Sequence, residues 1–167
     1  VEQCVSAIRE ERFKKVVPSR YKDMLLDKPL DPLEQFEKIR HNYPAAFASL
    51  IFVPGLGTWL GASPEVLVRM ESDHFSTMAL AGTQRLSPEQ DLRDVAWTQK
   101  EIEEQAMVSR YIINCFKKIR LREFEEDGPK TVKAANLIHL LTEFEVNMKS
   151  ANFEQLGTVM TELLHPT

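Results

Sequence analysis

The stretch TWLGASPEVLVRMESDHFSTMALAGTQR, residues 58–85, decides the fold that this sequence predicts. Its segment Gly61-Ala62-Ser63-Pro64 has the small residues and the proline that are typical of a tight turn. The run that follows, residues 66–68, is β-branched and aliphatic, as in a buried strand. This part of the stretch therefore predicts a turn that leads into a strand.

The second half of the stretch predicts that the chain folds back again. Residues 71–73 are typical of a turn, and residues 74–81 predict a returning strand. Gly82, which lacks a Cβ, and Thr83 end that strand. With residues 47–53 as the first strand, the sequence predicts a tight antiparallel meander.

Two features of the stretch suggest more than packing. Glu65 places a carboxylate at the mouth of an apolar strand, and Ala81-Gly82-Thr83 leaves bare backbone beside a hydroxyl, where a ligand could lie. A solvated turn glutamate and an ordinary glycine turn explain the same residues without any ligand. The residues alone leave both interpretations open.

A resemblance adds to these residues. GASPEVLV followed by ALAGT resembles the paired signature of the chorismate-utilising enzymes, which include isochorismate synthase, salicylate synthase and the large subunits of anthranilate and aminodeoxychorismate synthase. The ordered pair is specific, whereas either half alone is weak. The resemblance implies an α+β fold of antiparallel stacked sheets with outer helices, as in the anthranilate synthase large subunit. It also implies that Glu65 is catalytic and that Gly82 and Thr83 bind substrate.

Length and charge limit the classes of function. A chain of 167 residues is long enough to bury a core as one domain. Its net charge of −4 argues against a nucleic-acid or membrane-surface role, and no apolar run reaches the ~20 residues that span a bilayer. Cys4 and Cys115 have neither metal-site spacing nor disulfide density, so we expect a reduced, cytoplasmic setting.

Lys15 lies in a segment, residues 14–20, that the sequence predicts to be a strand. Pro18 cannot donate a ladder hydrogen bond and would mark an edge or a bulge. On its own, Lys15 is a charge at a strand entrance. KVVPSR nonetheless resembles the family's KVVLSR strand, in which the lysine is the general base, and Pro18 departs from the usual leucine. Family members that use ammonia carry glutamine at the Lys15 position.

A long helix is predicted at residues 96–123. Glu101 and Glu104 lie at i and i+3, hence on one face, where two carboxylates could meet a hard cation. The residues alone favour a solvated face, with Lys100 and Glu104 paired at i and i+4. KEIEEQ resembles the family's K-D/E-x-x-E-H segment, which implies a Mg²⁺ site. Gln105 departs from that segment's histidine.

Shorter elements surround these motifs. A helix is predicted at residues 2–13 with Val5 and Ile8 inward, and a second from Asp31, which can cap it, to Pro44. Residues 125–129 predict a loop, and residues 152–164 predict a last helix.

His139 stands in a predicted strand, residues 136–146, where it shares a face with Leu137 and Leu141. A lone histidine among leucines is often a satisfied core residue. NLIHLLTEF resembles the family's NL-x-HL-x-T strand, whose histidine lines the substrate pocket.

The resemblance covers residues 13–167, and its most similar member is isochorismate synthase. It implies that Lys15 activates water for attack on C2 of chorismate, that Glu65 protonates the departing C4 hydroxyl, and that Mg²⁺ binds Glu104 with Glu101 in support. Salicylate synthase and the anthranilate or aminodeoxychorismate synthase large subunits are alternatives, as is a non-catalytic fragment. The pathway (menaquinone or siderophore) and the oligomeric state stay open.

The end of the chain resembles the opening of a family loop. LHPT at residues 164–167 matches the start of HPTPAVGG. We therefore expect residues 1–167 to be a partial chorismate-binding catalytic domain that lacks a C-terminal and an N-terminal portion. We expect the fragment alone to be inactive.

Overall fold

The computed structural model describes residues 1–44, 46–85, 91–134 and 137–149. Its contacts divide the chain into two compact units, of which one holds Val1–Pro29 and the other begins at Leu30. The predicted helix at residues 152–164 lies outside the described residues. Among the described residues, no helix is both long and apolar enough to cross a bilayer.

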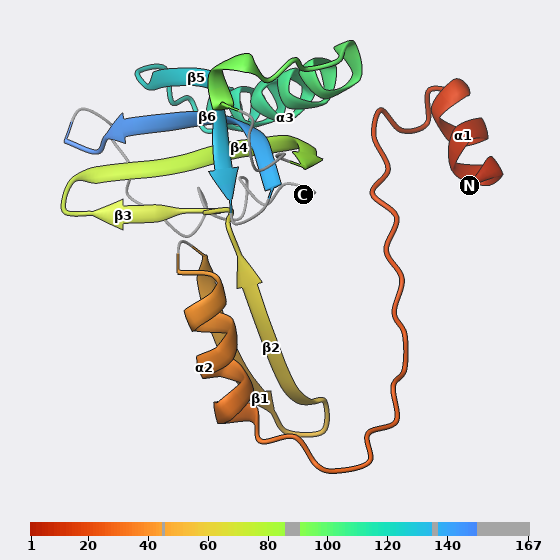
Figure 1. Cartoon of the computed structure of the whole chain (residues 1–167). Helices are drawn as coiled ribbons and strands as arrows, with labels where there is room; N and C mark the ends of the chain where they lie inside the picture. The colour runs from red at the N-terminus through yellow and green to blue at the C-terminus, as the bar shows by residue number, and fades with distance from the viewer. Residues whose placement is uncertain (45, 86–90, 135–136, 150–167) are drawn as a thin grey trace. The chain divides into compact units, whose positions relative to one another are not determined.

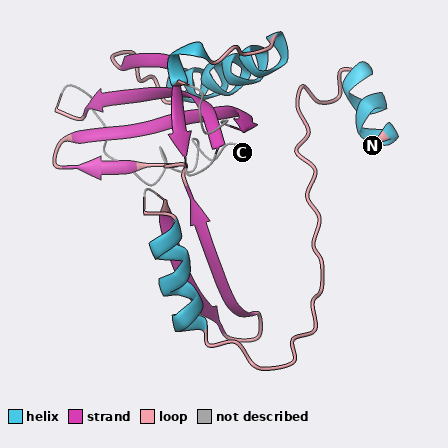
Figure 2. Ribbon diagram, in the orientation of Figure 1, coloured by secondary structure: helices cyan, strands magenta, loops and turns pink. Residues whose placement is uncertain are grey.

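The first unit has one helix, α1 (Glu2–Arg9), which is shorter than predicted. Val5 and Ile8 are 40% and 41% exposed, so the expectation that both point inward was wrong; Ala7 is the buried residue. The predicted strand at residues 14–20 was also wrong, because this segment is loop (Figure 2). A strand needs a partner for its backbone hydrogen bonds, and none pairs with this segment in the described part of the chain.

The second unit begins with α2 (Pro32–Asn42). The Asp31 carboxylate accepts the backbone N–H of Leu33 at 2.9 Å, which confirms the predicted cap. The strands β1 (Phe47–Val53) and β2 (Gly57–Ser63) follow as an antiparallel two-stranded sheet. Helix α2 contacts both of these strands.

The predicted meander is interrupted after β2. Gly61, Ala62 and Ser63 form the end of β2 rather than a turn, and residues 66–68 are irregular; the next strand is the short β3 (Arg69–Glu71). Side-chain hydroxyls form hydrogen bonds with the backbone in this segment. The Glu65 N–H donates to the Ser63 hydroxyl at 3.2 Å, and the Thr77 hydroxyl donates to the Leu67 carbonyl at 2.7 Å. The first of these is a local side-chain-to-backbone bond, a kind that competes with strand pairing.

A four-stranded antiparallel sheet of order β3-β4-β6-β5 forms the centre of this unit. Its long strands are β4 (His74–Arg85), β5 (Glu125–Ala134) and β6 (Leu137–Asn147). The prediction for β6 is confirmed. The predicted loop at residues 125–129 was wrong: β5 starts at Glu125, and its Gly-Pro pair sits where the pairing register shifts, as at a β-bulge.

Helix α3 (Gln99–Lys118) packs on β4 and β6 (Figure 1). A 3₁₀ turn, η1 (Leu92–Asp94), precedes it. The buried residues alternate along β4 and β6, and those on one face meet the helix. The resulting core includes Phe75, Ala79, Ile112, Cys115, Phe116, Phe144 and Val146. The architecture is therefore α+β with antiparallel sheets, as predicted.

Phe116 is the aromatic centre of this core. It is fully buried, and its ring contacts those of Phe75, Phe124 and Phe144. We expect Phe116→Ala to lower the free energy of unfolding by about 3–5 kcal/mol through lost contacts and a cavity. Urea denaturation measures this. Phe52→Ala is the matched control, because Phe52 is 70% exposed and should cost at most about 0.5 kcal/mol.

Candidate functional site

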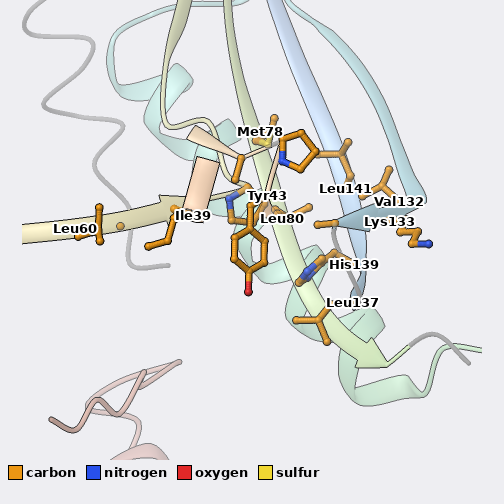
Figure 3. Close-up of a pocket in the computed structure, with 16 residues that line it drawn as sticks. Ile39, Tyr43, Leu60, Met78, Leu80, Val132, Lys133, Leu137, His139 and Leu141 are labelled. Carbon is orange, nitrogen blue, oxygen red and sulfur yellow. The ribbon is translucent and has the colours of Figure 1, made fainter. Parts of the chain in front are cut away.

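A hollow of about 690 Å³ lies beside the four-stranded sheet, a volume suited to a small-molecule ligand. Its lining is largely apolar, and Figure 3 shows the side chains that surround it. The sheet contributes Met78, Leu80, Val132, Leu137, His139 and Leu141. The end of α2, the residues after it and the end of β2 contribute Ile39, Tyr43, Pro44, Leu60, Gly61 and Pro64.

His139 reaches this hollow because side chains alternate along β6. Ile138 and Leu140 are buried on one face of β6, whereas Leu137, His139 and Leu141 line the hollow on the other. The predicted shared face is therefore confirmed.

A β-bulge at Gly82 decides which side chain meets His139. Ala81 pairs with Leu140, and Thr83 pairs with His139, so Gly82 is an extra residue in β4. In a regular strand Thr83 would share a face with Ala81, toward α3; the inserted residue turns it to the face of His139. The Thr83 Oγ1 lies 3.2 Å from His139 Nδ1, within hydrogen-bond distance.

The bulge needs glycine. Gly82 has φ +66°, and a Cβ built on it would lie 3.0 Å from the Cβ of Glu101 and 3.5 Å from Cζ3 of Trp97. The first turn of α3 thus packs directly against the Gly82 backbone. The expectation that Gly82 ends the strand was wrong, since β4 continues to Arg85.

Glu101 has a structural partner at the start of α3. Its carboxylate accepts the Thr98 backbone N–H at 3.0 Å and also the Thr98 hydroxyl, as in a capping box. The hydrogen bond from the Thr98 hydroxyl holds the pKa of Glu101 below its ordinary value, partly offset by desolvation. Glu101 is therefore ionised at neutral pH.

The predicted metal ligands fit a hard cation in part. Glu101 and Glu104 are half-buried carboxylates on one helix, and carboxylate oxygens are donors that Mg²⁺ accepts. In the described ranges, no group of three or more His, Cys, Asp or Glu residues could hold a metal ion. The two carboxylates would therefore supply only part of a ligand set.

Gln105, which replaces the family's histidine, ties α3 to the sheet. It is 2% exposed, and its Nε2 donates to the Ala79 carbonyl at 3.0 Å and to the Thr142 hydroxyl at 2.9 Å. Its buried Oε1 has no hydrogen-bond partner in the part of the chain that the structure describes. The side chain bridges β4 and β6 from the position next to Glu104.

Burial lowers the pKa of His139 from its ordinary value of 6.5, and a hydrogen bond with the Gly82 backbone partly offsets this. The imidazole is therefore neutral at neutral pH. As a neutral ring, His139 offers the hollow a hydrogen-bonding group without a charge.

The other two predicted catalytic residues lie elsewhere along the chain. Glu65 is half-buried and follows Pro64, which lines the hollow. Lys15 is half-buried in the first compact unit. The structure thus brings together Gly82, Thr83, His139 and the first turn of α3.

Sequence reasoning missed two residues of this site. Tyr43 lines the hollow, and Trp97 packs against Gly82 while its indole N–H donates to the Thr131 hydroxyl at 2.9 Å. Tyr43 follows a helix end and Trp97 precedes a helix start, so neither lies in a periodic pattern. Only the adjacent Pro44, which ends α2, signalled that the chain turns near Tyr43.

A protein-family model described as chorismate binding enzyme matches residues 1–167. The chain belongs to the chorismate-binding enzyme family. Among its curated relatives, isochorismate synthase EntC of Escherichia coli K12 is 30% identical over 158 residues, which are 92% of this chain and 40% of EntC. Isochorismate synthase MenF of Bacillus subtilis is 27% identical over 173 residues, 100% of this chain and 36% of MenF.

The fold is shared with a solved structure. A crystal structure from Bacillus anthracis, assigned as the 2,3-dihydroxybenzoate-specific isochorismate synthase DhbC, superposes with a TM-score of 0.70 over 84% of this chain and 39% of that one. At 19% identity this likeness concerns the fold alone. The chain spans about two fifths of the length of the curated relatives it matches.

The Gly82 bulge can be tested by adding one methyl group. We expect Gly82→Ala to lower the free energy of unfolding by about 1–3 kcal/mol, because alanine disfavours positive φ and its Cβ would press on Glu101. Gly61→Ala is the control, since the nearest heavy atom to its added Cβ is Ser49 Oγ at 3.8 Å. Equal losses in urea denaturation of the two variants would contradict the role given to the bulge.

The pKa shift of His139 predicts a dependence of stability on pH. The folded state lowers the pKa of His139, so its contribution to stability is complete above pH 6.5 and is lost as pH falls through the lowered value. We expect the free energy of unfolding to fall less between pH 7 and pH 5 in His139→Gln than in the wild type, as measured by urea denaturation at each pH. His74→Gln, at an exposed site, should keep the wild-type dependence.

Proposed function

We propose that the protein carrying this chain is an isochorismate synthase that converts chorismate to isochorismate. The observation that carries the proposal is the hollow lined by His139, whose ring contacts Thr83 beside the Gly82 bulge, in a member of the chorismate-binding family. The matched curated relatives EntC and MenF bear the name isochorismate synthase. Lys15 supports the same choice, because a lysine can activate water.

The proposed reaction exchanges one hydroxyl for another across the ring. As the general base, Lys15 would take a proton from water as the water oxygen bonds to C2. The ring double bonds shift, the C4–O bond breaks, and Glu65, as the general acid, would give a proton to the leaving hydroxyl, which departs as water. Water is therefore both consumed and released, and the product is an isomer of chorismate.

Binding would use the hollow and the start of α3. The apolar side chains from β4 and β6 would exclude water from the ring, and His139, which contacts Thr83, would supply an uncharged hydrogen-bonding group. Glu104, with Glu101 in support, would hold Mg²⁺ through carboxylate oxygens. When bound, this ion would offset the repulsion between a dianionic substrate and a chain of net charge −4.

Product analysis tests the proposal. We expect the whole protein, supplied with chorismate and Mg²⁺, to release isochorismate, which chromatography with mass detection identifies. EDTA should abolish turnover and added Mg²⁺ should restore it, because carboxylate oxygens are donors that suit a hard cation.

Other products would overturn the proposed reaction. Salicylate with pyruvate would assign the protein as a salicylate synthase, and aminated product formed with ammonia would assign it to the anthranilate or aminodeoxychorismate class. Undiminished turnover in EDTA would contradict the magnesium site.

Lys15→Gln separates a water-activating base from a surface charge. In the whole protein we expect kcat to fall by roughly 10²–10⁴-fold, the usual value of general-base catalysis, with a smaller change in KM. Lys14→Gln is the matched control, because it removes the same charge from the adjacent residue and should keep wild-type turnover. Glu65→Gln should lose a comparable amount, since the leaving hydroxyl would lack its proton donor.

The fold of each variant is checked by circular dichroism and urea denaturation. A folded Lys15→Gln protein within a few-fold of wild-type kcat would end the proposed mechanism. Added ammonia, a nucleophile that needs no base, should partly restore product formation in Lys15→Gln but not in Glu65→Gln.

A further inference from the structure

A second hollow, of about 390 Å³, lies at the C-terminal end of α3, and we call it the basic hollow. It is lined by Lys117, Arg120, Leu121, Arg122 and Phe124. Leu121 belongs to the hydrophobic core and Phe124 packs against that core, whereas the lysine and the two arginines are exposed. The basic hollow therefore combines two apolar residues with three cationic ones.

The three cations of the basic hollow lack a negative partner. In the part of the chain that the structure describes, no carboxylate forms an ion pair with the side chain of Lys117, Arg120 or Arg122. Acidic residues are not scarce, because the chain as a whole has a net charge of −4. Like charges that share a hollow repel one another, and a bound anion would offset that repulsion.

The backbone at Arg120 is strained. Helix α3 ends in a Schellman motif, in which the Leu121 N–H donates to the Phe116 carbonyl at 2.9 Å and the Arg120 N–H donates to the Lys117 carbonyl at 3.0 Å. Arg120 takes the place in this motif that glycine usually holds, and its φ is +62°. A side chain disfavours this left-handed conformation. An arginine at such a position indicates a use for its side chain.

The helix dipole accounts for only part of this cluster. A cation in the last turn of a helix interacts favourably with the free carbonyls there, which explains Lys117. The effect falls off beyond the last turn, so it does not explain Arg122. Guanidinium groups present forks of N–H donors that match the oxygens of a phosphate group. Two such groups and a lysine suit an anion that carries more than one phosphate.

We propose that the basic hollow is a binding site for a diphosphate group, which Lys117, Arg120 and Arg122 contact. The site is distinct from the one proposed for chorismate, because Glu101 and Glu104 lie near the opposite end of α3. The inference goes beyond the proposed function and rests on this chain alone. Inorganic diphosphate and the diphosphate of a larger molecule present the same oxygens to the three cations, so both are used as probes.

Isothermal titration calorimetry of the whole protein tests the proposal. The probes are inorganic phosphate, inorganic diphosphate and adenosine diphosphate, in magnesium-free buffer at constant ionic strength. Leaving out Mg²⁺ avoids its chelation by diphosphate, and constant ionic strength keeps the screening of exposed charges equal. We expect saturable binding of diphosphate, tighter than that of phosphate because diphosphate brings more negative charge to the three cations. Tighter binding of adenosine diphosphate would assign the site to a larger molecule, and equal or weaker binding would assign it to the free anion.

Arg120→Gly separates anion binding from folding. Because glycine is the usual residue at this position, we expect the variant to unfold at the same urea concentration as the wild type or at a higher one. We expect its affinity for diphosphate to fall by about 10-fold or more, the usual value of hydrogen bonds to a charged group. Arg122→Gln should weaken binding by a similar factor. Arg9→Gln is the matched control, because Arg9 is also an exposed arginine in the last turn of a helix and should leave binding unchanged.

Three results would overturn the proposal. The first is a wild-type protein that shows no saturable binding of diphosphate. The second is wild-type affinity in both Arg120→Gly and Arg122→Gln. The third is an equal loss of affinity in Arg9→Gln, which would indicate an effect of net charge instead of a site. Conversion of chorismate is measured separately, so each of these results leaves the proposed function as it stands.

Discussion

The pairing of β4 with β6 is the interaction on which the rest of the described structure depends. It runs from His74 opposite Asn147 to Arg85 opposite Leu137, and every other element of the four-stranded sheet joins one of these two strands. One face of the pair buries side chains under α3, whereas the other face forms the floor of the hollow. The buried core and the candidate site therefore depend on the same backbone hydrogen bonds.

The elements that depend on sequence patterns within a single helix or strand were predictable. Alternation along residues 136–146 predicted β6 and the face on which His139 lies, and helical spacing predicted α3 within a few residues at its start. The carboxylate of Asp31 and the proline after it located the start of α2. The site residues at Gly82, Thr83 and His139 were singled out from bare backbone and from motif resemblance, and the structure places them together.

Prediction failed where a strand depends on a distant partner or where a turn residue is absorbed into a strand. Residues 14–20 and 66–68 have strand composition, but composition does not supply a partner strand. Near residues 66–68, the hydroxyls of Ser63 and Thr77 form hydrogen bonds with the backbone groups of Glu65 and Leu67. Gly82 has the composition of a turn, but the ladder to β6 continues past it because one extra residue can bulge out. The acidic cluster around Glu101 predicted a metal ligand, whereas the structure shows Glu101 in a capping box with Thr98.

The amide of Gln105 fixes the rotation of α3 about its own axis on the sheet. Its single nitrogen is bonded to β4 and β6 at once, so any roll of the helix about its own axis would stretch both bonds. The same rotation would displace Glu101 and Glu104, because they lie in the turn of the same helix that precedes Gln105. The direction in which the two carboxylates point is thus set by a contact inside the core. A substitution of Gln105 would therefore change the direction of these two carboxylates, even though no surface residue is changed.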